Sequence, residues 1–163
     1  MSIWRTVVLE RFVRRILAEL QRDARQSVQE LSARVGLSST PCWRRLKEIE
    51  KAGLIRRHTV LLDREAIGLK ECLLAHVTLA RHVGTAVDEF ERAVLAHPEV
   101  IECYSTTGDA DYILKVVVPD MKAYDNFLHK QIFAIAGVAN VRTAVVLREV
   151  KYDTVLPIDT ESA

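Results

Sequence analysis

The strongest constraint on the fold is a short stretch that contains the N-terminal signals of two helices, with a glycine that ends the first helix between them. Ser27 stands three residues before Glu30, the spacing of a capping box that opens a helix. Gly36 ends that helix, because glycine readily takes the left-handed conformation that a tight turn needs. Ser38 caps the next helix, and Pro41 falls in its first turn, where the missing N–H costs little. Two helices joined by a glycine turn are therefore expected.

A longer amphipathic segment precedes this pair. Apolar residues recur at helical spacing from Leu9 to Leu20, with arginines on the other face. The second helix of the pair has an inward stripe that steps by four and three residues, namely Cys42, Leu46 and Ile49. The run 54–62 is short and partly β-branched, which indicates an extended segment. Residues 1–63 are therefore predicted to form a helix-turn-helix domain, with the motif itself at about 27–46.

Basic residues are concentrated in this first domain. The chain has 23 Lys+Arg and 22 Asp+Glu, of which residues 1–63 contain 13 and 7, and residues 64–163 the remaining 10 and 15. Such a split indicates that the first part meets a polyanion, although the net charge of the whole chain is only +1. A chance imbalance, or an ordinary helical hairpin with a solvated basic face, would give the same pattern.

The second helix of the pair is the expected recognition helix for double-stranded DNA. The N-terminal residues of such a helix come closest to base edges in the major groove. The candidates for this role are Ser39, Thr40, Trp43 and Arg44, and the cap residue Ser38 is also counted among the DNA-binding residues. Arg45 and Lys47 are assigned to phosphate groups. Trp43 is equally compatible with a partly buried anchor under the first helix.

The second half of the chain alternates between strand and helix patterns. The expected strands are 72–79, 100–106, 112–118 and 141–150; the expected helices start near Ala86, ending before His97-Pro98, and after Asp120, ending at Gly137. Leu73, Ala75, Val77 and Leu79 are expected to share one face of the first strand, and Met121 is expected to point inward from the second helix. The order β-α-β-β-α-β is ferredoxin-like, with helices on one face of an antiparallel sheet. The whole chain is thus predicted to be α+β, with a linker at 64–70, a second domain at 71–156 and a loose tail at 157–163.

Several classes of protein are disfavoured by what the sequence lacks. No apolar run approaches the ~20 residues that cross a bilayer, and no signal peptide is recognisable, so a cytoplasmic protein without a membrane partner is expected. The cysteines Cys42, Cys72 and Cys103 are widely spaced, and each is expected to be a small buried hydrophobe. The histidines form no motif, and no nucleophile–base pair is recognisable. No catalytic residue, metal or cofactor is therefore predicted.

Six stretches of the sequence match the pattern of a known protein family. They are 16–25, 30–45 and 53–56 in the first half, and 108–112, 118–121 and 145–151 in the second. In this order they resemble the Lrp/AsnC family of leucine- and asparagine-responsive transcription regulators, over nearly the whole chain. The resemblance implies a winged helix-turn-helix domain that binds DNA. It also implies a C-terminal domain that dimerises through its sheet, and dimers that often assemble into octamers.

The resemblance further implies a small-molecule effector, an amino acid or related metabolite, bound between C-terminal domains near a Gly-x-x-Asp turn. The residues carried over are Thr107, Gly108, Asp109 and Asp111, with Met121, Ala144, Val145 and Val146 adjoining. Gly108 would let backbone N–H groups approach an α-carboxylate, and an aspartate can accept hydrogen bonds from an α-ammonium group. From the residues alone, a plain hairpin turn is the favoured explanation of the same glycine and aspartates, and only the resemblance reverses this preference.

The sequence departs from the family pattern at three places. Leu9-Glu10-Arg11-Phe12-Val13 stands where the family usually has Leu-Asp-x-x-Asp, and His58 stands where tyrosine is common. Ala144 replaces a larger residue of some leucine-responding members, which questions leucine as the effector. The predicted function is a sequence-specific transcription regulator whose DNA binding or assembly responds to an amino acid. The alternative is a metabolite-binding module without a regulatory role on DNA.

Overall fold

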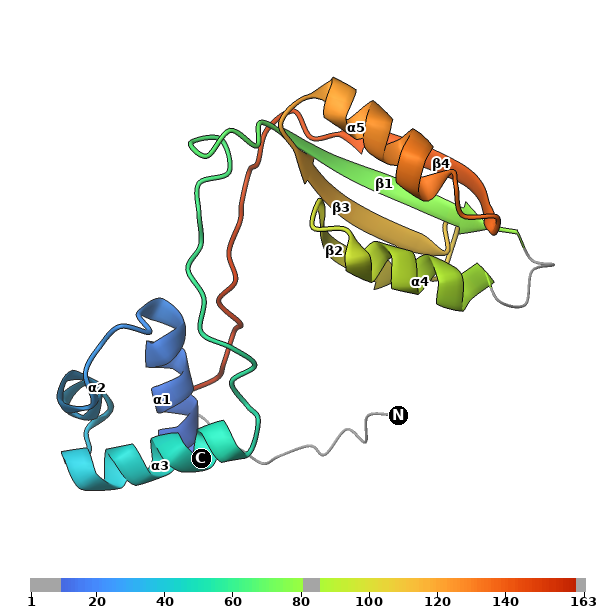
Figure 1. Ribbon diagram of the computed structural model, residues 1–163. Helices are drawn as coiled ribbons and strands as arrows, with labels where there is room; N and C mark the ends of the chain where they lie inside the picture. Colours follow the sequence, from blue (N-terminus) through green and yellow to red (C-terminus); the bar gives the residue numbers. More distant parts are fainter. Residues whose placement is uncertain (1–9, 81–85, 161–163) are drawn as a thin grey trace. The chain divides into compact units, whose positions relative to one another are not determined.

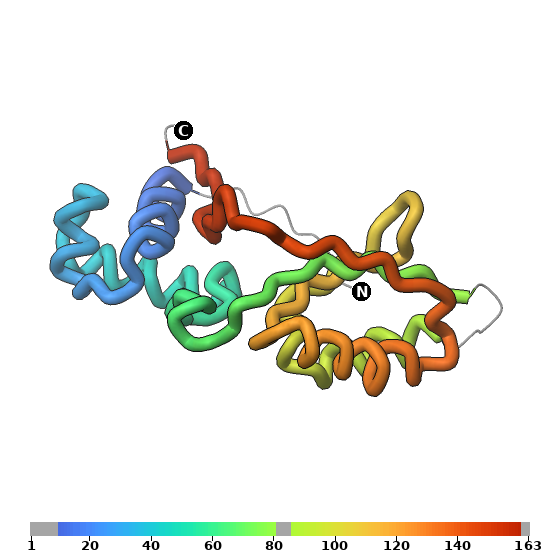
Figure 2. The backbone as a smooth tube through the Cα atoms, turned by 90° about the horizontal axis from the view of Figure 1, so that it is seen from above, coloured from blue at the N-terminus to red at the C-terminus, as the bar shows by residue number. Residues whose placement is uncertain are grey.

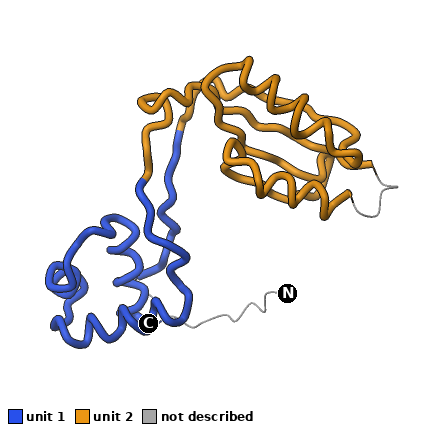
Figure 3. Tube along the Cα trace, viewed as in Figure 1, with its two compact units in different colours: residues 1–60, 151–163 blue, residues 61–150 orange. Residues whose placement is uncertain are grey.

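The computed structural model describes residues 10–80 and 86–160, which form two compact units (Figures 1 and 3). Unit 1 contains the chain up to residue 60 together with the segment from residue 151 onward, and unit 2 contains residues 61–150. The chain therefore crosses between the units twice. Residues 151–156, predicted to belong to the second domain, group with unit 1 by their contacts. The end of the expected loose tail, 161–163, lies outside the described residues.

Unit 1 contains the three helices that the sequence predicts. They are α1 (Arg11–Arg22), α2 (Val28–Val35) and α3 (Ser39–Lys51). Their buried side chains form one core that consists of Ile16, Leu31, Val35, Cys42 and Ile49. Cys42 and Ile49 belong to the predicted inward stripe of α3, and its third member, Leu46, packs against the same core. The predicted first position of α1, Leu9, lies outside the described residues.

Local sequence signals set the helix boundaries in unit 1. The Ser27 Oγ accepts a hydrogen bond from the Glu30 N–H at 3.2 Å, and the Glu30 carboxylate accepts one from the Ser27 N–H at 2.7 Å, so the predicted capping box is present. Gly36 ends α2 with a φ of 74°. Ser38 is at the predicted cap position of α3, but its side chain makes no capping hydrogen bond. Residues 54–62, predicted as extended, form neither helix nor strand.

Unit 2 is a four-stranded antiparallel sheet with the predicted β-α-β-β-α-β order. Its elements are β1 (Glu71–Leu79), α4 (Ala86–Ala96), β2 (Val100–Ser105), β3 (Tyr112–Val118), α5 (Met121–Phe127), the π-helical turn η1 (Leu128–Ile132) and β4 (Val138–Val145). The strands lie in the order β2-β3-β1-β4, so the two central strands are β3 and β1. Helices α4 and α5 cover one face of this sheet (Figures 1 and 2).

The core of unit 2 lies between the sheet and these helices. Alternate residues of β1 point into it, as predicted: Leu73, Ala75, Val77 and Leu79 are all buried. The facing residues of β3 and the helices complete the core, and they include Leu114, Val116, Phe90, Tyr124 and Phe127. The period of two along β1 therefore identifies its buried face, because successive side chains of a strand point to opposite sides.

Three predictions for unit 2 were wrong in detail. Strand β4 spans Val138–Val145 rather than 141–150, because the chain leaves the edge of the sheet after Val146 donates to the Cys72 carbonyl. Met121, predicted to point inward, is 46% exposed because it precedes the inward stripe that starts at Tyr124. Cys103, predicted to be buried, is exposed because it lies on the edge strand β2.

A close contact fixes the start of α4 against the end of the sheet. Gly137, which precedes β4, has no room for a side chain: a Cβ there would lie 2.3 Å from the Ala86 Cβ and 3.0 Å from the Ala86 Cα. The Gly137 carbonyl also accepts a hydrogen bond from the Ala80 N–H at 2.8 Å, just after β1. Gly137 is therefore required by the close approach of α4, and its φ is not in the left-handed region.

We expect Gly137→Ala to destabilise unit 2 by about 1–3 kcal/mol, the usual cost of overpacking a well-filled site. Urea unfolding followed by circular dichroism measures the change. The double variant Ala86→Gly/Gly137→Ala should lose less than the sum of the two single changes, because one of the two overlapping Cβ atoms is then absent. Additive losses in the double variant would contradict a direct contact.

Candidate nucleic-acid interface and ligand pocket

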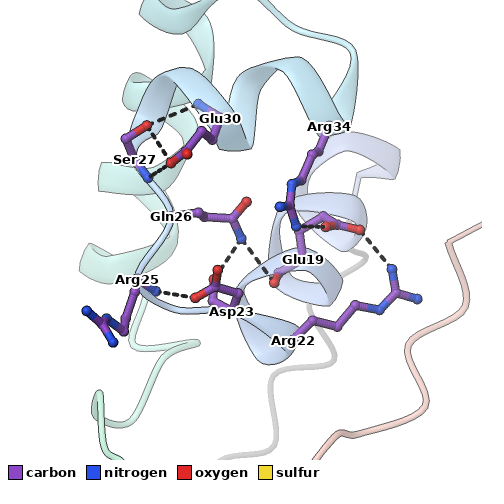
Figure 4. A network of polar contacts seen from close by, with 8 residues as sticks. All are labelled: Glu19, Arg22, Asp23, Arg25, Gln26, Ser27, Glu30 and Arg34. Atoms are coloured by element: carbon purple, nitrogen blue, oxygen red, sulfur yellow. Dashed lines mark hydrogen bonds and ion pairs between the residues drawn. The ribbon is translucent and has the colours of Figure 1, made fainter.

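A network of polar contacts sets the angle between α1 and α2 (Figure 4). The Glu19 carboxylate lies 2.8 Å from the Arg22 guanidinium and 3.5 Å from that of Arg34 on α2. The Gln26 side-chain amide donates to the carbonyls of Glu19 and Asp23, at 3.1 and 2.7 Å. The Glu19 carbonyl also accepts the Asp23 N–H at 3.0 Å, so Gln26 is its second partner. For the Asp23 carbonyl, which lies at the end of the helix and has no partner within it, Gln26 supplies the hydrogen bond.

The turn between α2 and α3 depends on one buried hydroxyl. Ser32 is only 4% exposed; its Oγ donates to the Gln29 carbonyl at 2.8 Å and lies 3.4 Å from the Ser39 Oγ at the start of α3. The Ser32 carbonyl accepts the Leu37 N–H at 2.9 Å, beyond the left-handed Gly36. These contacts determine which face of α3 is turned toward the core.

The outward face of α3 brings most of the predicted DNA-binding residues together. Ser38, Ser39, Thr40, Trp43, Arg44 and Lys47 are all exposed. Trp43 is 53% exposed, so it is not a buried anchor beneath α1. The Arg44 guanidinium is 3.9 Å from Glu48, and the Lys47 ammonium is 2.8 Å from Glu50. Exposed pairs of this kind contribute little to stability, so a phosphate group can replace the carboxylate at small cost.

Arg45 differs from the other candidates because it faces α1. Its guanidinium pairs with the Glu10 carboxylate and lies over the Phe12 ring, 5.7 Å from the centroid. Only 24% of its side chain is exposed. Glu10 is one of the residues at which the chain departs from the family pattern, and this ion pair gives it a structural role. The periodicity of α3 alone could not reveal the contact, because the partner lies 35 residues away in the sequence.

In unit 2, the connection between β2 and β3 is held in shape by its own hydrogen bonds. The Thr106 hydroxyl donates to the Ala110 carbonyl at 2.7 Å, and the Thr106 N–H to the Asp111 carbonyl at 2.9 Å. Gly108 has a φ of 128°, a conformation that favours glycine. Asp111 attaches this turn to β1: its N–H donates to Val77, and its carboxylate accepts the Leu79 N–H at 2.7 Å.

A pocket of about 290 Å³ lies beside this turn, near the low end of the range for small-molecule sites. Its polar lining comes from Ser105, Thr106, Asp111 and Tyr112, and its apolar lining from Leu79, Ala80, Ala86 and Val87. Burial and a 2.7 Å hydrogen bond to Glu91 raise the pKa of Tyr112 to about 12, so the phenol stays neutral. The residues that line the pocket thus include one acidic residue, three residues with hydroxyl groups and four apolar residues.

The predicted effector residues do not meet within one chain. Asp111 lines the pocket, and Thr107, Gly108 and Asp109 are exposed in the turn beside it. The other four, Met121, Ala144, Val145 and Val146, are at the opposite end of the sheet, since Val145 pairs with Leu73 and Met121 follows β3. Strand β3 separates the two groups by roughly 20 Å, at about 3.3 Å per residue.

Sequence reasoning missed most residues that line the pocket. Thr106 and Tyr112 flank the predicted turn directly, so the hairpin pattern contained a signal for them. The pairing of β1 with β3 brings Leu79 to the pocket, and the packing of α4 on the sheet brings Ala86 and Val87. No local pattern in the sequence identifies them.

The residues in the ranges 10–80 and 86–160 offer no metal site, because no group of three or more His, Cys, Asp or Glu side chains in these ranges could hold a metal ion. None of the helices in these ranges is long and apolar enough to span a bilayer.

Comparison with known families covers both units. Residues 9–56 match the winged helix-turn-helix DNA-binding family, and residues 72–156 match the Lrp/AsnC ligand binding domain. The leucine-responsive regulatory protein of Escherichia coli (strain K12) is 41% identical over 152 residues, which are 93% of each chain.

Solved structures with the same fold include two regulators. A transcriptional regulator from Neisseria meningitidis, in complex with L-Met, has a TM-score of 0.89 and 36% identity, over 93% of this chain and 97% of that one. An AsnC family transcriptional regulator from Agrobacterium tumefaciens has a TM-score of 0.87 and 40% identity, over 94% and 100%. The likeness therefore extends through both units.

The capping box is expected to make the stability of the helical unit depend on pH in the acid range. Hydrogen bonds from the Ser27 N–H and hydroxyl hold the pKa of Glu30 below its ordinary value of 4.5. A carboxylate whose pKa is lowered by folding adds stability above its unfolded pKa, and this stability is lost as the pH falls through the folded pKa. We expect the unfolding midpoint of wild type to fall more steeply than that of Glu30→Gln as the pH drops below about 4.5. Parallel profiles for the two proteins would contradict this.

Proposed function

The chain belongs to the Lrp/AsnC family, and we propose that it regulates transcription by binding double-stranded DNA through α3 while responding to an amino acid bound to unit 2. The observation that carries the proposal is the outward face of α3. It presents Trp43, Arg44 and Lys47 to solvent while its opposite face is buried in the core. A recognition helix needs this division between an anchored and an accessible face.

On DNA, we assign base contacts to the first two turns of α3, through Ser39, Thr40, Trp43 and Arg44. Arginine can donate two parallel hydrogen bonds to guanine, and the Thr40 methyl group can contact a thymine methyl. Lys47 and the cap residue Ser38 are assigned to phosphates. Arg45, which pairs with Glu10, is assigned to holding α3 against α1.

The effector is assigned to the pocket beside the β2–β3 turn. Its Asp111 carboxylate suits an α-ammonium group, and Leu79 and Val87 suit an apolar side chain. The backbone near Gly108 can approach the α-carboxylate. One relative is named as leucine-responsive and one similar structure contains L-Met, which supports an apolar amino acid as the class of effector here.

Assembly is part of the proposal, with a homodimer as its smallest form. Met121 and Ala144–Val146 lie far from the pocket in one chain, so only a second copy can bring them to the Gly108 turn of the first. A two-fold dimer would present two recognition helices to successive major grooves. Further assembly into octamers, a cytoplasmic location and a non-enzymatic role complete the proposal. An effector would then act by its different affinities for the assembly states.

We expect Arg44→Ala to weaken binding to the DNA upstream of the protein's own coding sequence by about 1–3 kcal/mol, the usual worth of a base contact. Lys47→Ala should weaken binding to all sequences and reduce the salt slope by about 1. Fluorescence anisotropy over a salt series measures both. Arg92→Ala, an exposed arginine on α4 of unit 2, is the charge-matched control. Unchanged affinity in both α3 variants would favour a metabolite-binding module without a role on DNA.

We expect L-leucine or L-methionine at ~100 times its dissociation constant to stabilise the wild-type protein by about 2.7 kcal/mol, seen as a thermal shift. Asp111→Asn should weaken the ligand about tenfold or more, because a hydrogen bond to a charged group is lost. The asparagine oxygen can still accept the Leu79 N–H, so the fold should persist. Asp125→Asn on α5 is the charge-matched control. Equal shifts in Asp111→Asn and wild type would contradict the pocket assignment.

A further inference from the structure

Residues 151–160 follow the last strand of unit 2, yet they belong to the DNA-binding unit (Figure 3). We propose that this segment is a strap: it docks on α1 and couples the position of the helix-turn-helix to the sensing unit. Its regulatory meaning rests on the proposed function. The docking itself does not, because it follows from contacts within unit 1.

The main contact is a two-way pair of hydrogen bonds between the strap and Gln21, near the end of α1. The Gln21 side-chain oxygen accepts the Leu156 N–H at 2.7 Å, and its Nε2 donates to the Leu156 carbonyl at 3.1 Å. The Gln21 amide thus forms the same pair of hydrogen bonds with the main chain of Leu156 that a residue of a neighbouring β-strand would form. The pair uses only main-chain atoms of Leu156, whose own side chain is 68% exposed.

Further contacts order the strap on either side of Leu156. Toward the C-terminus, the Arg14 guanidinium donates to the Asp159 carbonyl at 3.2 Å, and the Ile158 N–H donates to the Leu156 carbonyl at 2.9 Å. Toward the N-terminus, the Asp153 carboxylate accepts the Val155 N–H at 2.9 Å, a local turn that restricts the chain. The strap therefore has a defined path along α1.

The other end of the strap is attached to unit 2. The Val146 N–H donates to the Cys72 carbonyl at 2.9 Å, and the Glu149 carboxylate is 3.9 Å from the Lys115 ammonium. Only seven steps of chain separate Glu149 from Leu156, so a docked strap leaves a short length of chain between its anchor in unit 2 and its anchor on α1.

The first connection between the units is anchored differently. Ile55 packs against the core of unit 1, and Asp63 begins a hydrogen-bonded turn in unit 2. Between them, from Arg56 to Leu62, the backbone makes no hydrogen bond to any other described backbone group. A docked strap therefore adds a second short connection, so that a change in unit 2 reaches the helical unit through two connections instead of one.

Hydrogen–deuterium exchange of the full chain tests the docking. Gln21→Ala removes both hydrogen bonds and raises helix propensity, so α1 should stay folded. Leu156→Pro removes the N–H of the pair, whereas Leu156→Ala keeps both main-chain groups and is the matched control. We expect residues 152–160 to exchange about fivefold faster in Gln21→Ala and Leu156→Pro than in wild type and Leu156→Ala. Equal exchange in all four proteins overturns the strap.

The coupling is tested by the ratio of DNA affinities with and without saturating L-leucine or L-methionine. We expect this ratio to be at least about threefold smaller in Gln21→Ala and Leu156→Pro than in the control, with amino-acid binding itself unchanged. Equal ratios overturn the coupling role. If the wild-type protein binds neither DNA nor these amino acids, the proposed function fails instead, and the exchange comparison alone decides the strap.

Discussion

The left-handed turn at Gly36 is the constraint on which the DNA-binding unit depends. With Ser32 buried beneath it, the turn sets the rotation of α3 about its own axis, so that Cys42 and Ile49 enter the core. The same rotation exposes Trp43 and Arg44. A different rotation would bury polar groups without partners, which costs more than this small unit could recover. Recognition surface and hydrophobic core are thus two outcomes of one backbone geometry.

Asp111 has three roles in unit 2. Its main chain closes the turn with Thr106, its carboxylate holds the last residue of β1, and it lines the pocket. A cation that draws this carboxylate toward itself competes with the Leu79 N–H. Binding of such a ligand would then weaken the hydrogen bond of the Leu79 N–H, at the end of the central strand β1. This is a physical route from the pocket to the sheet that needs no rearrangement of the core.

The sequence predicted what depends on neighbours along the chain. The Ser27–Glu30 capping box, the Gly36 turn and the alternation along β1 involve residues a few positions apart, and the fold follows from them and from the order of the elements. Contacts between distant segments could not be read in this way. The Arg45–Glu10 pair, the α4 residues of the pocket and the docking of Leu156 on Gln21 join residues separated by tens of positions or more. The resemblance supplied the effector residues, but not their separation within one chain.

The contact between Gly137 and Ala86 has a consequence for how such a chain can change over time. A larger residue at 137 is disfavoured as long as residue 86 carries a Cβ, and Ala86 also lines the pocket. A substitution at one of these positions therefore changes which residues the other can accept. A lineage that acquires a different ligand by altering the first turn of α4 must do so within the room that Gly137 leaves, so the history of the pocket is tied to a residue outside it.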